Sequence, residues 1–95
     1  MITETWQADG EGRIDLIIDG EEKAVAFMDL LKTDSGKLVI KHTEVAPEMT
    51  GKGYGKQLLA YVVDYSRQNS LKILPVCPYA KNLMYRDLEA YRDVM

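Results

Sequence analysis

The amino-acid sequence predicts a mixed α+β fold, in which an antiparallel β meander is followed by a β-α-β crossover. Apolar residues alternate with polar ones in the first half, recur every three or four positions after residue 55, and form a short run at residues 71–77. The 95 residues have ordinary globular usage, with 46% hydrophobic and 28% charged types. We therefore expect a single domain over residues 1–95.

The first half of the sequence predicts an antiparallel meander. Asp19-Gly20 is a hairpin signal, and residues 33–36 form a second turn cluster. The strands, including a short edge strand at the start, are expected over residues 2–8, 14–18, 23–32 and 37–45. In the last of these strands, a strict period of two places His42 on the same face as Leu38 and Ile40.

The second half predicts one main helix and a final strand. Residues from 55 onward carry apolar side chains on one face, and Asn69-Ser70 ends the helix. Residues 71–77 are apolar enough for a buried strand, and residues 79–86 and 88–94 are predicted to form short helices. A right-handed crossover makes strands 37–45 and 71–77 parallel, with the main helix on one face of a mixed sheet.

Composition excludes several classes of protein. The net charge of −3 argues against a dedicated nucleic-acid binder, and no apolar run approaches the roughly 20 residues of a membrane span. Cys77 is the single cysteine, which argues against a disulfide scaffold or a structural zinc site, so we expect no metal. The N-terminus has no basic start followed by an apolar stretch, so we expect a cytoplasmic protein.

Residues 50–56 are the most informative segment. The sequence reads Thr50-Gly51-Lys52-Gly53-Tyr54-Gly55-Lys56, between the end of a strand and the start of a helix. Glycines let a ligand approach the backbone, and the first amides of a helix form an anion site at the positive end of its dipole. The second half also carries seven bases and four acids. The segment therefore predicts a phosphate or pyrophosphate site.

Two common phosphate motifs do not fit this segment. Thr50 and Gln57 stand where a P-loop requires glycine and Ser or Thr, and the third glycine comes one residue early for the dinucleotide fingerprint. A tight loop with two solvated lysines is the alternative interpretation.

At these residues the chain resembles the GNAT superfamily of acetyl-CoA-dependent N-acetyltransferases. Gly53-x-Gly55 matches the end of the superfamily's cofactor loop, and Thr50 stands where Arg or Gln is usual. The segments 42–45 (His-Thr-Glu-Val) and 77–79 (Cys-Pro-Tyr) resemble a subgroup of very small GNAT-like proteins. The likeness extends from about residue 11 onward.

The resemblance implies acetyl-CoA as co-substrate, with its pyrophosphate at residues 50–56. It also implies that the strands before and after the main helix splay apart, so that the pantetheine arm meets the backbone around Val45. The small size implies an open acceptor site, which suits an exposed amine on a protein or peptide. The sequence leaves both a monomer and a small homo-oligomer open.

Two side chains are candidates for catalysis. The resemblance puts Cys77 near the thioester, as a nucleophile or an aid to the leaving thiolate, and a buried apolar cysteine is the alternative. His42, the only histidine, suits proton transfer at neutral pH and is hypothesised to pair with Cys77, although a packed core histidine also fits. Secondary candidates are Glu44 as a base, Tyr79 or Tyr85 as a hydroxyl donor, and Asn82.

Three functions remain open from the sequence. The first is a small N-acetyltransferase that acts on a primary amine. The second is a module that binds CoA or acyl-CoA without turnover, and the third is a structural domain. The first two need the loop at residues 50–56, and only the first needs Cys77 and His42.

Overall fold

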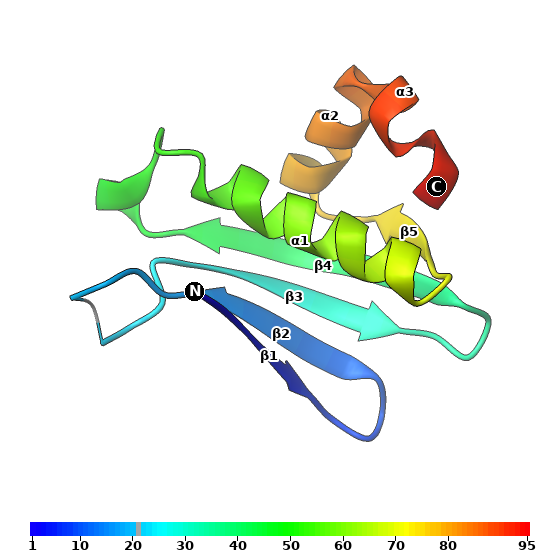
Figure 1. The fold of residues 1–95 in the computed structure, drawn as a ribbon, viewed down its shortest axis with the longest axis horizontal. Coiled ribbons are helices and arrows are strands. Elements are labelled where there is room, and N and C mark those ends of the chain that lie inside the picture. The colour runs from blue at the N-terminus through cyan, green and yellow to red at the C-terminus, as the bar shows by residue number, and fades with distance from the viewer. Residues whose placement is uncertain (21) are drawn as a thin grey trace.

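The computed structural model describes residues 1–20 and 22–95, and within them five strands form one sheet (Figure 1). The sheet order is β1-β2-β3-β4-β5, in which the first four strands are antiparallel neighbours and β5 is parallel to β4. The strands are β1 (Ile2–Trp6), β2 (Glu11–Leu16), β3 (Ala26–Lys32), β4 (Lys37–Val45) and β5 (Lys72–Pro75). The predicted meander and parallel crossover are therefore confirmed.

The helices lie on one face of this sheet (Figure 1). They are η1 (Pro47–Met49), α1 (Tyr54–Gln68), α2 (Pro78–Arg86), α3 (Leu88–Tyr91) and η2 (Arg92–Val94). The buried residues of α1 are those that the helical period predicts: Gly55, Leu58, Leu59, Val62, Val63 and Ser66. The leucines and valines among them share one core with buried residues of the sheet and α2. No helix in the described part of the chain is both long and apolar enough to cross a bilayer.

Four predicted strands have other bounds in the structure. β1 ends at Trp6 rather than at residue 8, and β2 covers Glu11–Leu16 rather than residues 14–18, because the turn between them lies at residues 7–10, where the Gly10 amide donates to the Gln7 carbonyl at 3.1 Å. β3 begins at Ala26 rather than at residue 23, so residues 17–25 connect it to β2, and residue 21 of this connection lies outside the described residues. β5 ends at Pro75 rather than at residue 77 because proline has no N–H for the ladder. The amides of Val76 and Cys77 both donate to the Ile40 carbonyl, at 3.1 and 2.9 Å, as the chain turns into α2.

The predicted orientation of His42 is wrong, because β4 contains a β-bulge. Asp29 on β3 pairs with His42, whereas its neighbour Leu30 pairs with Ile40, so Lys41 is an extra residue. The bulge reverses the alternation of side chains beyond it. Thr43 therefore faces the helix side with Ile40, while His42 is exposed on the opposite face.

β4 and β5 separate beyond Ile40, as the resemblance to the GNAT superfamily implies for the strands before and after the main helix. The last pair in their ladder is Ile40 with Pro75, and β4 continues alone on that side to Val45. The Ala46 amide donates to the Val25 carbonyl, 2.8 Å away, on the β3 side. Because successive residues of a strand point their backbone groups to opposite edges, the N–H and C=O of Val45 face the open edge.

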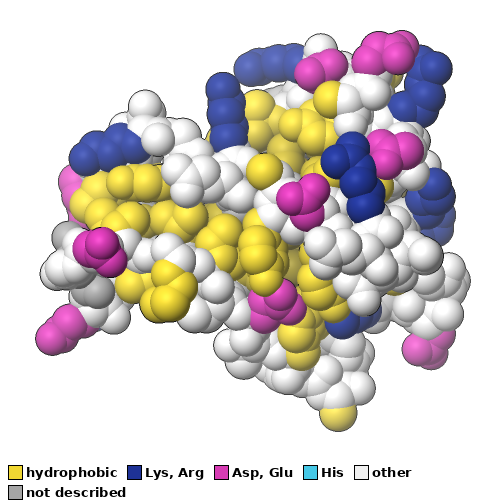
Figure 2. Space-filling view, viewed as in Figure 1, with side chains coloured by type: hydrophobic (Ala, Val, Ile, Leu, Met, Phe, Trp, Pro, Cys, Tyr) yellow, Lys and Arg dark blue, Asp and Glu magenta, His cyan; other side chains and the backbone are white. Residues whose placement is uncertain are grey.

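Basic side chains lie along the upper and right-hand edges of the molecule. Figure 2 shows Lys and Arg side chains (dark blue) over the segment before α1, over α2 and on the side of the C-terminal helices, where Asp and Glu side chains (magenta) lie among them. This placement agrees with the excess of bases in the second half of the sequence.

Candidate functional site

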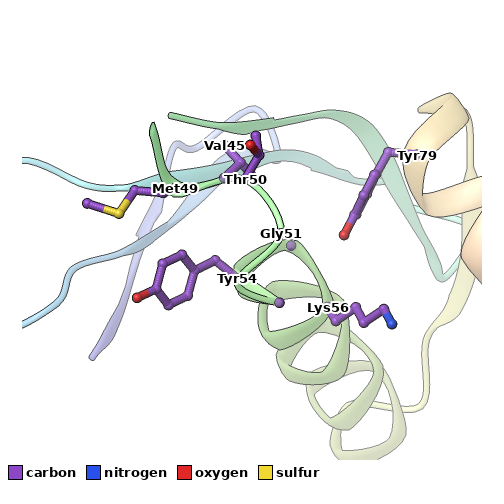
Figure 3. Close-up of a pocket in the computed structure, with 9 residues that line it drawn as sticks. Val45, Met49, Thr50, Gly51, Tyr54, Lys56 and Tyr79 are labelled. Atoms are coloured by element: carbon purple, nitrogen blue, oxygen red, sulfur yellow. The ribbon is translucent and has the colours of Figure 1, made fainter. Parts of the chain in front are cut away.

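A pocket of about 320 Å³ lies where β4, the loop of residues 50–56 (the glycine loop) and α2 meet (Figure 3). Its lining residues are Val45, Met49, Thr50, Gly51, Gly53, Tyr54, Gly55, Lys56 and Tyr79. Seven of these residues are predicted cofactor-binding residues, whereas the eighth such residue, Lys52, does not line the pocket. Met49 was missed because nothing in the sequence singles it out.

Two glycines give the loop its shape. Gly51 and Gly53 both have a φ of +81°, in the left-handed region that favours glycine, and Gly53 is the N-cap of α1. A Cβ built on either residue would meet no atom within 4 Å. The backbone at these glycines is therefore open to an approaching ligand.

The amides of this loop are unused by the described part of the chain. The first N–H of α1 with a backbone partner is that of Gln57, which donates to the Gly53 carbonyl at 3.1 Å. No side chain caps the helix, and Thr50 turns back to donate from both its amide and its hydroxyl to the Pro47 carbonyl. The N–H groups of residues 51–56 are therefore left without an acceptor among the described residues, at the positive end of α1.

The electrostatics of the pocket also favour an anion. No acidic residue lines it, and Lys56 stands at its edge. Neither Lys56 nor Lys52 forms an ion pair with a described residue. The loop can therefore accept a phosphate group by backbone hydrogen bonds and by unpaired positive charge.

Tyr79 closes one side of the pocket. It comes from the first turn of α2 and points toward the glycine loop, on the same side as Lys56 (Figure 3). A Cβ on Gly55 would lie 2.3 Å from the Tyr79 hydroxyl oxygen, so the ring needs a glycine at that position. Burial, together with the nearby Cys77, raises the pKa of Tyr79, so its hydroxyl stays protonated at neutral pH.

Cys77 is buried at the N-terminus of α2, behind the pocket rather than in its lining. Its thiol donates to the Thr43 hydroxyl at 3.4 Å. Burial raises the pKa of Cys77, but the Thr43 hydroxyl and the backbone N–H groups of Ala80 and Tyr79 more than offset it, and the net pKa is lowered. The thiolate is thus stabilised where β4 and β5 part.

The structure does not bring His42 and Cys77 together. Thr43 contacts Cys77, and its neighbour His42 points to the opposite face of the sheet. There His42 Nε2 lies 3.5 Å from Glu44 Oε1, and its ring centroid is 5.9 Å from that of Phe27. The hypothesis that His42 and Cys77 pair directly is therefore wrong. It assumed that His42 lies on the helix-covered face with Ile40, and the bulge places it on the other face.

The remaining candidates lie away from the pocket. Tyr85 and Asn82 are exposed on α2 and do not line it. Glu44 is exposed beside His42.

In this fold a mixed sheet opens beside the first turn of its central helix, and the glycine loop lies at the opening. The sequence model of the GCN5-related N-acetyltransferases matches residues 13–94. The chain therefore belongs to the GCN5-related N-acetyltransferase (GNAT) family, and this membership supports acyl transfer as the class of reaction.

Solved structures agree with this assignment. A GCN5-like protein from Staphylococcus aureus is 34% identical, with a TM-score of 0.73, over 99% of this chain and 85% of that one. A ribosomal-protein-alanine N-acetyltransferase from Brucella melitensis is 20% identical, with a TM-score of 0.68, over 84% of this chain and 64% of that one. The fold is also shared with an aminoglycoside N-acetyltransferase solved with CoA, which is 17% identical with a TM-score of 0.61, over 83% of this chain and 67% of that one. No curated protein sequence matches significantly.

Proposed function

We propose that the protein is a small N-acetyltransferase, which moves an acetyl group from acetyl-CoA to a primary amine. The observation that carries the proposal is the row of unbonded amides at residues 51–56, in a pocket with no acidic lining residue. These amides and Lys56 bind the diphosphate of CoA. Family membership supports the reaction class, and a fold neighbour solved with CoA supports the cofactor.

The pantetheine arm runs along the open edge of β4. The Val45 backbone faces this edge and also lines the pocket, so the arm can leave the diphosphate site and hydrogen-bond as an added strand. Following β4 toward Ile40, the arm reaches Thr43 and Cys77, where the two strands meet. This route puts the thioester close to the Cys77 thiol.

The chemistry then needs two proton movements. The amine nitrogen attacks the thioester carbonyl and loses a proton, the carbon–sulfur bond breaks, and the CoA thiolate leaves and takes up a proton. Because His42 and Cys77 lie on opposite faces, they act on different partners. Cys77 acts at the thioester in one of two ways. As a thiolate it attacks the carbonyl and releases the CoA thiolate, and the amine then displaces it from the acetyl group; as a thiol it donates its proton to the leaving CoA thiolate. In either case His42 accepts the proton of the amine.

The position of His42 also sets the direction from which the acceptor arrives. His42, Glu44 and Phe27 lie on the sheet face opposite the helices. The acceptor amine approaches from this face, which is accessible to an amine on a peptide or protein.

A CoA-binding module without turnover is the second candidate. Two observations favour it: Cys77 is only 3% exposed, and its thiol bonds Thr43 rather than His42. This candidate uses the same glycine loop and the same diphosphate contact.

Thermal unfolding with CoA and with acetyl-CoA tests the shared part of both candidates. Ligand at ~100 times its Kd should add about 2.7 kcal/mol to the free energy of unfolding, which raises Tm by roughly 10–20 °C in a domain of this size. The Gly53→Val variant should lose the shift. Gly36→Val is the matched control, because Gly36 has a φ of +84° and open space around it but lies in the β3–β4 turn. No shift with either ligand at millimolar concentration contradicts both candidates.

Acetyl transfer to a lysine-containing peptide separates the two candidates. His42→Ala and Cys77→Ala should each lower kcat by about a hundredfold if the residues act as proposed. Mass measurement of the intact protein after incubation with acetyl-CoA then shows whether one acetyl group is retained on Cys77. Full activity of both variants would remove these residues from the mechanism, and no transfer by the wild type would favour the binding module.

A further inference from the structure

The sheet face opposite the helices is left uncovered by the described part of the chain (Figure 1). The strand register arranges its side chains in rows that cross the strands, because residues paired on neighbouring strands point to the same face. One row contains Asp15 on β2, Phe27 on β3 and Glu44 on β4. Another row reaches β5, where Leu74 pairs with Val39.

Phe27 is the centre of a charged part of this uncovered face. Its cross-strand neighbours are the carboxylates of Asp15 and Glu44. The guanidinium carbon of Arg13 lies 3.9 Å from the centroid of the ring, and Asp29 bonds Arg13 at 2.7 Å. Because Asp29 neutralises this cation, the two carboxylates beside the ring keep their negative charge. This part of the face is therefore complementary to a positively charged side chain.

The gap beyond Ile40 separates this charged part from an apolar one. Leu74 and Val76 are 52% and 58% exposed on the far side of the gap. Val76 lies directly beside the gap, because its amide donates to the carbonyl of Ile40, the last β4 residue in the ladder with β5. An amine that enters the gap toward His42 thus has carboxylates on one side and apolar side chains on the other.

The dimensions of the sheet set the spacing of the groups that it can recognise. Neighbouring strands lie about 4.8 Å apart, so the β3 residue Phe27 lies roughly 7 Å from the middle of the gap on the far side of β4. In an extended peptide, side chains two residues apart point the same way and are also separated by about 7 Å. A lysine that points into the gap therefore turns its second neighbours toward the sheet, one on each side of the gap.

We infer that the acceptor is a lysine in an extended peptide segment, with a basic residue two positions away on one side and an apolar residue two positions away on the other. The basic side chain lies over Phe27, between Asp15 and Glu44. The apolar side chain lies against Leu74 and Val76 beyond the gap. The inference rests on the proposed function, in which the acceptor amine arrives from this face, and it names the class of acceptor.

Binding of short peptides to the CoA-bound protein, measured by calorimetry, tests the inference. The peptides have blocked ends and read Leu-Gly-Lys-Gly-Arg or its reverse, with Gln or Glu in place of Arg in the comparison peptides. The wild type should bind the Arg peptide about tenfold more tightly than the Glu peptide, because two exposed ion pairs replace two repulsive contacts. Serine in place of the leucine should weaken binding by about fivefold, as partial burial of a leucine allows.

The Asp15→Asn variant tests the assigned contact. It should lower the preference for the Arg peptide over the Glu peptide to about threefold, since one of the two carboxylates loses its charge. Asp34→Asn is the matched control and should keep the full preference, because Asp34 is an exposed carboxylate in the turn between β3 and β4. A urea unfolding midpoint for each variant confirms that the fold is retained.

The outcomes separate this inference from the proposed function, once acetylation rates of the same peptides are measured with acetyl-CoA. Equal affinity for the Arg and Glu peptides, or no binding of either, overturns the inference, and acetylation of a small amine then leaves the transferase standing. An equal loss of preference in Asp15→Asn and Asp34→Asn also overturns the inference, since general charge attraction would explain it. An affinity that is unaffected by replacing the leucine overturns the apolar contact. Charge-selective binding without acetylation of any peptide or small amine overturns the proposed function and leaves the peptide surface.

Discussion

Gly55 and Gly53 suit their positions in the glycine loop for different physical reasons. Gly53 has a positive φ and caps α1, so its requirement comes from the backbone. Gly55 lies within α1 and is required because the Tyr79 ring occupies the space of its Cβ. The spacing of the glycines predicts the loop, but only the structure shows what each glycine does.

A Gly55→Ala variant is expected to weaken CoA binding without unfolding the protein. The new methyl group displaces the Tyr79 ring from the pocket wall, while alanine favours the helix by about 1 kcal/mol relative to glycine. The stability should therefore stay within about 1 kcal/mol of the wild type, since an exposed ring can move. Urea unfolding and CoA titration measure the two effects.

The double variant Gly55→Ala/Tyr79→Ala provides the control. If Gly55→Ala weakens CoA binding by displacing the Tyr79 ring, the double variant should bind CoA with the same affinity as Tyr79→Ala alone. An unchanged affinity of Gly55→Ala itself would show that the position of Tyr79 is irrelevant to binding.

The Cys77 thiol should titrate below its ordinary range, and Thr43→Val should raise its pKa. The hydrogen bond with the Thr43 hydroxyl lowers the pKa of Cys77, whereas burial raises it. Without the hydroxyl, the effect of burial is offset less and the pKa rises. Ultraviolet absorbance of the thiolate as a function of pH measures the change, with Cys77→Ala subtracted to remove the tyrosine signal. An identical titration midpoint in Thr43→Val and the wild type would exclude this role of Thr43.

The orientation of His42 is the feature of the site that the sequence could not predict. Its strand alternates regularly from Leu38 onward, and nothing in the residue types marks Lys41 as an extra residue. The bulge arises from the register with β3, a contact distant in sequence. Pairing between strands, rather than local pattern, therefore decides which face the histidine occupies.

At the scale of elements, α1 is tied to the edge of the sheet by a polar contact. The Tyr61 hydroxyl of α1 donates to the Glu4 carboxylate on β1, and the Trp6 indole N–H donates to the same carboxylate at 2.9 Å. The hydrogen bond to Glu4 raises the pKa of Tyr61 to about 12. The Tyr61 and Trp6 hydrogen bonds lower the pKa of Glu4.

Tyr61→Phe should lower the free energy of unfolding by about 1 kcal/mol at pH 7, a value reduced for the solvent exposure of the pair. Because the folded-state pKa of Glu4 is lowered, its contribution is present above the unfolded pKa and is lost as pH falls through the folded pKa. The raised pKa of Tyr61 makes its contribution full below the unfolded pKa, about 10, and lost as pH rises through about 12.

Urea unfolding of the wild type and of Tyr61→Phe, at pH 7 and in acid, measures this contribution. The difference between the two proteins should shrink in acid, once Glu4 is protonated. A difference that is independent of pH would show that the ring, rather than its hydroxyl, accounts for the effect.

Most elements could be predicted from the sequence because their signals are local. The range of β4 agrees with the prediction at both ends, and α1 begins one residue earlier than expected. The start of β3 could not be predicted, because Val25 is buried like a strand residue although it precedes the ladder. The early end of β5 follows from Pro75, whose effect on hydrogen bonding is visible in the sequence.

At the scale of the whole molecule, the two faces of the sheet differ in what covers them. The helices cover one face and carry the glycine loop, the pocket and Cys77 (Figures 1 and 3). The other face carries Phe27, His42 and Glu44, none of which belongs to the core. In the function that we propose, the cofactor and the acceptor approach the gap beside β4 from opposite sides, and the two reactants meet at the thioester.

Titration of the ¹⁵N-labelled protein with CoA, followed by backbone amide NMR, tests the central claim most directly. The account predicts that the largest shifts fall on the amides of residues 51–56, with Gly51, Gly53 and Gly55 resolved among them, and that Gly53→Val abolishes these shifts. Saturable binding that moves other amides while those of residues 51–56 stay unchanged would contradict it.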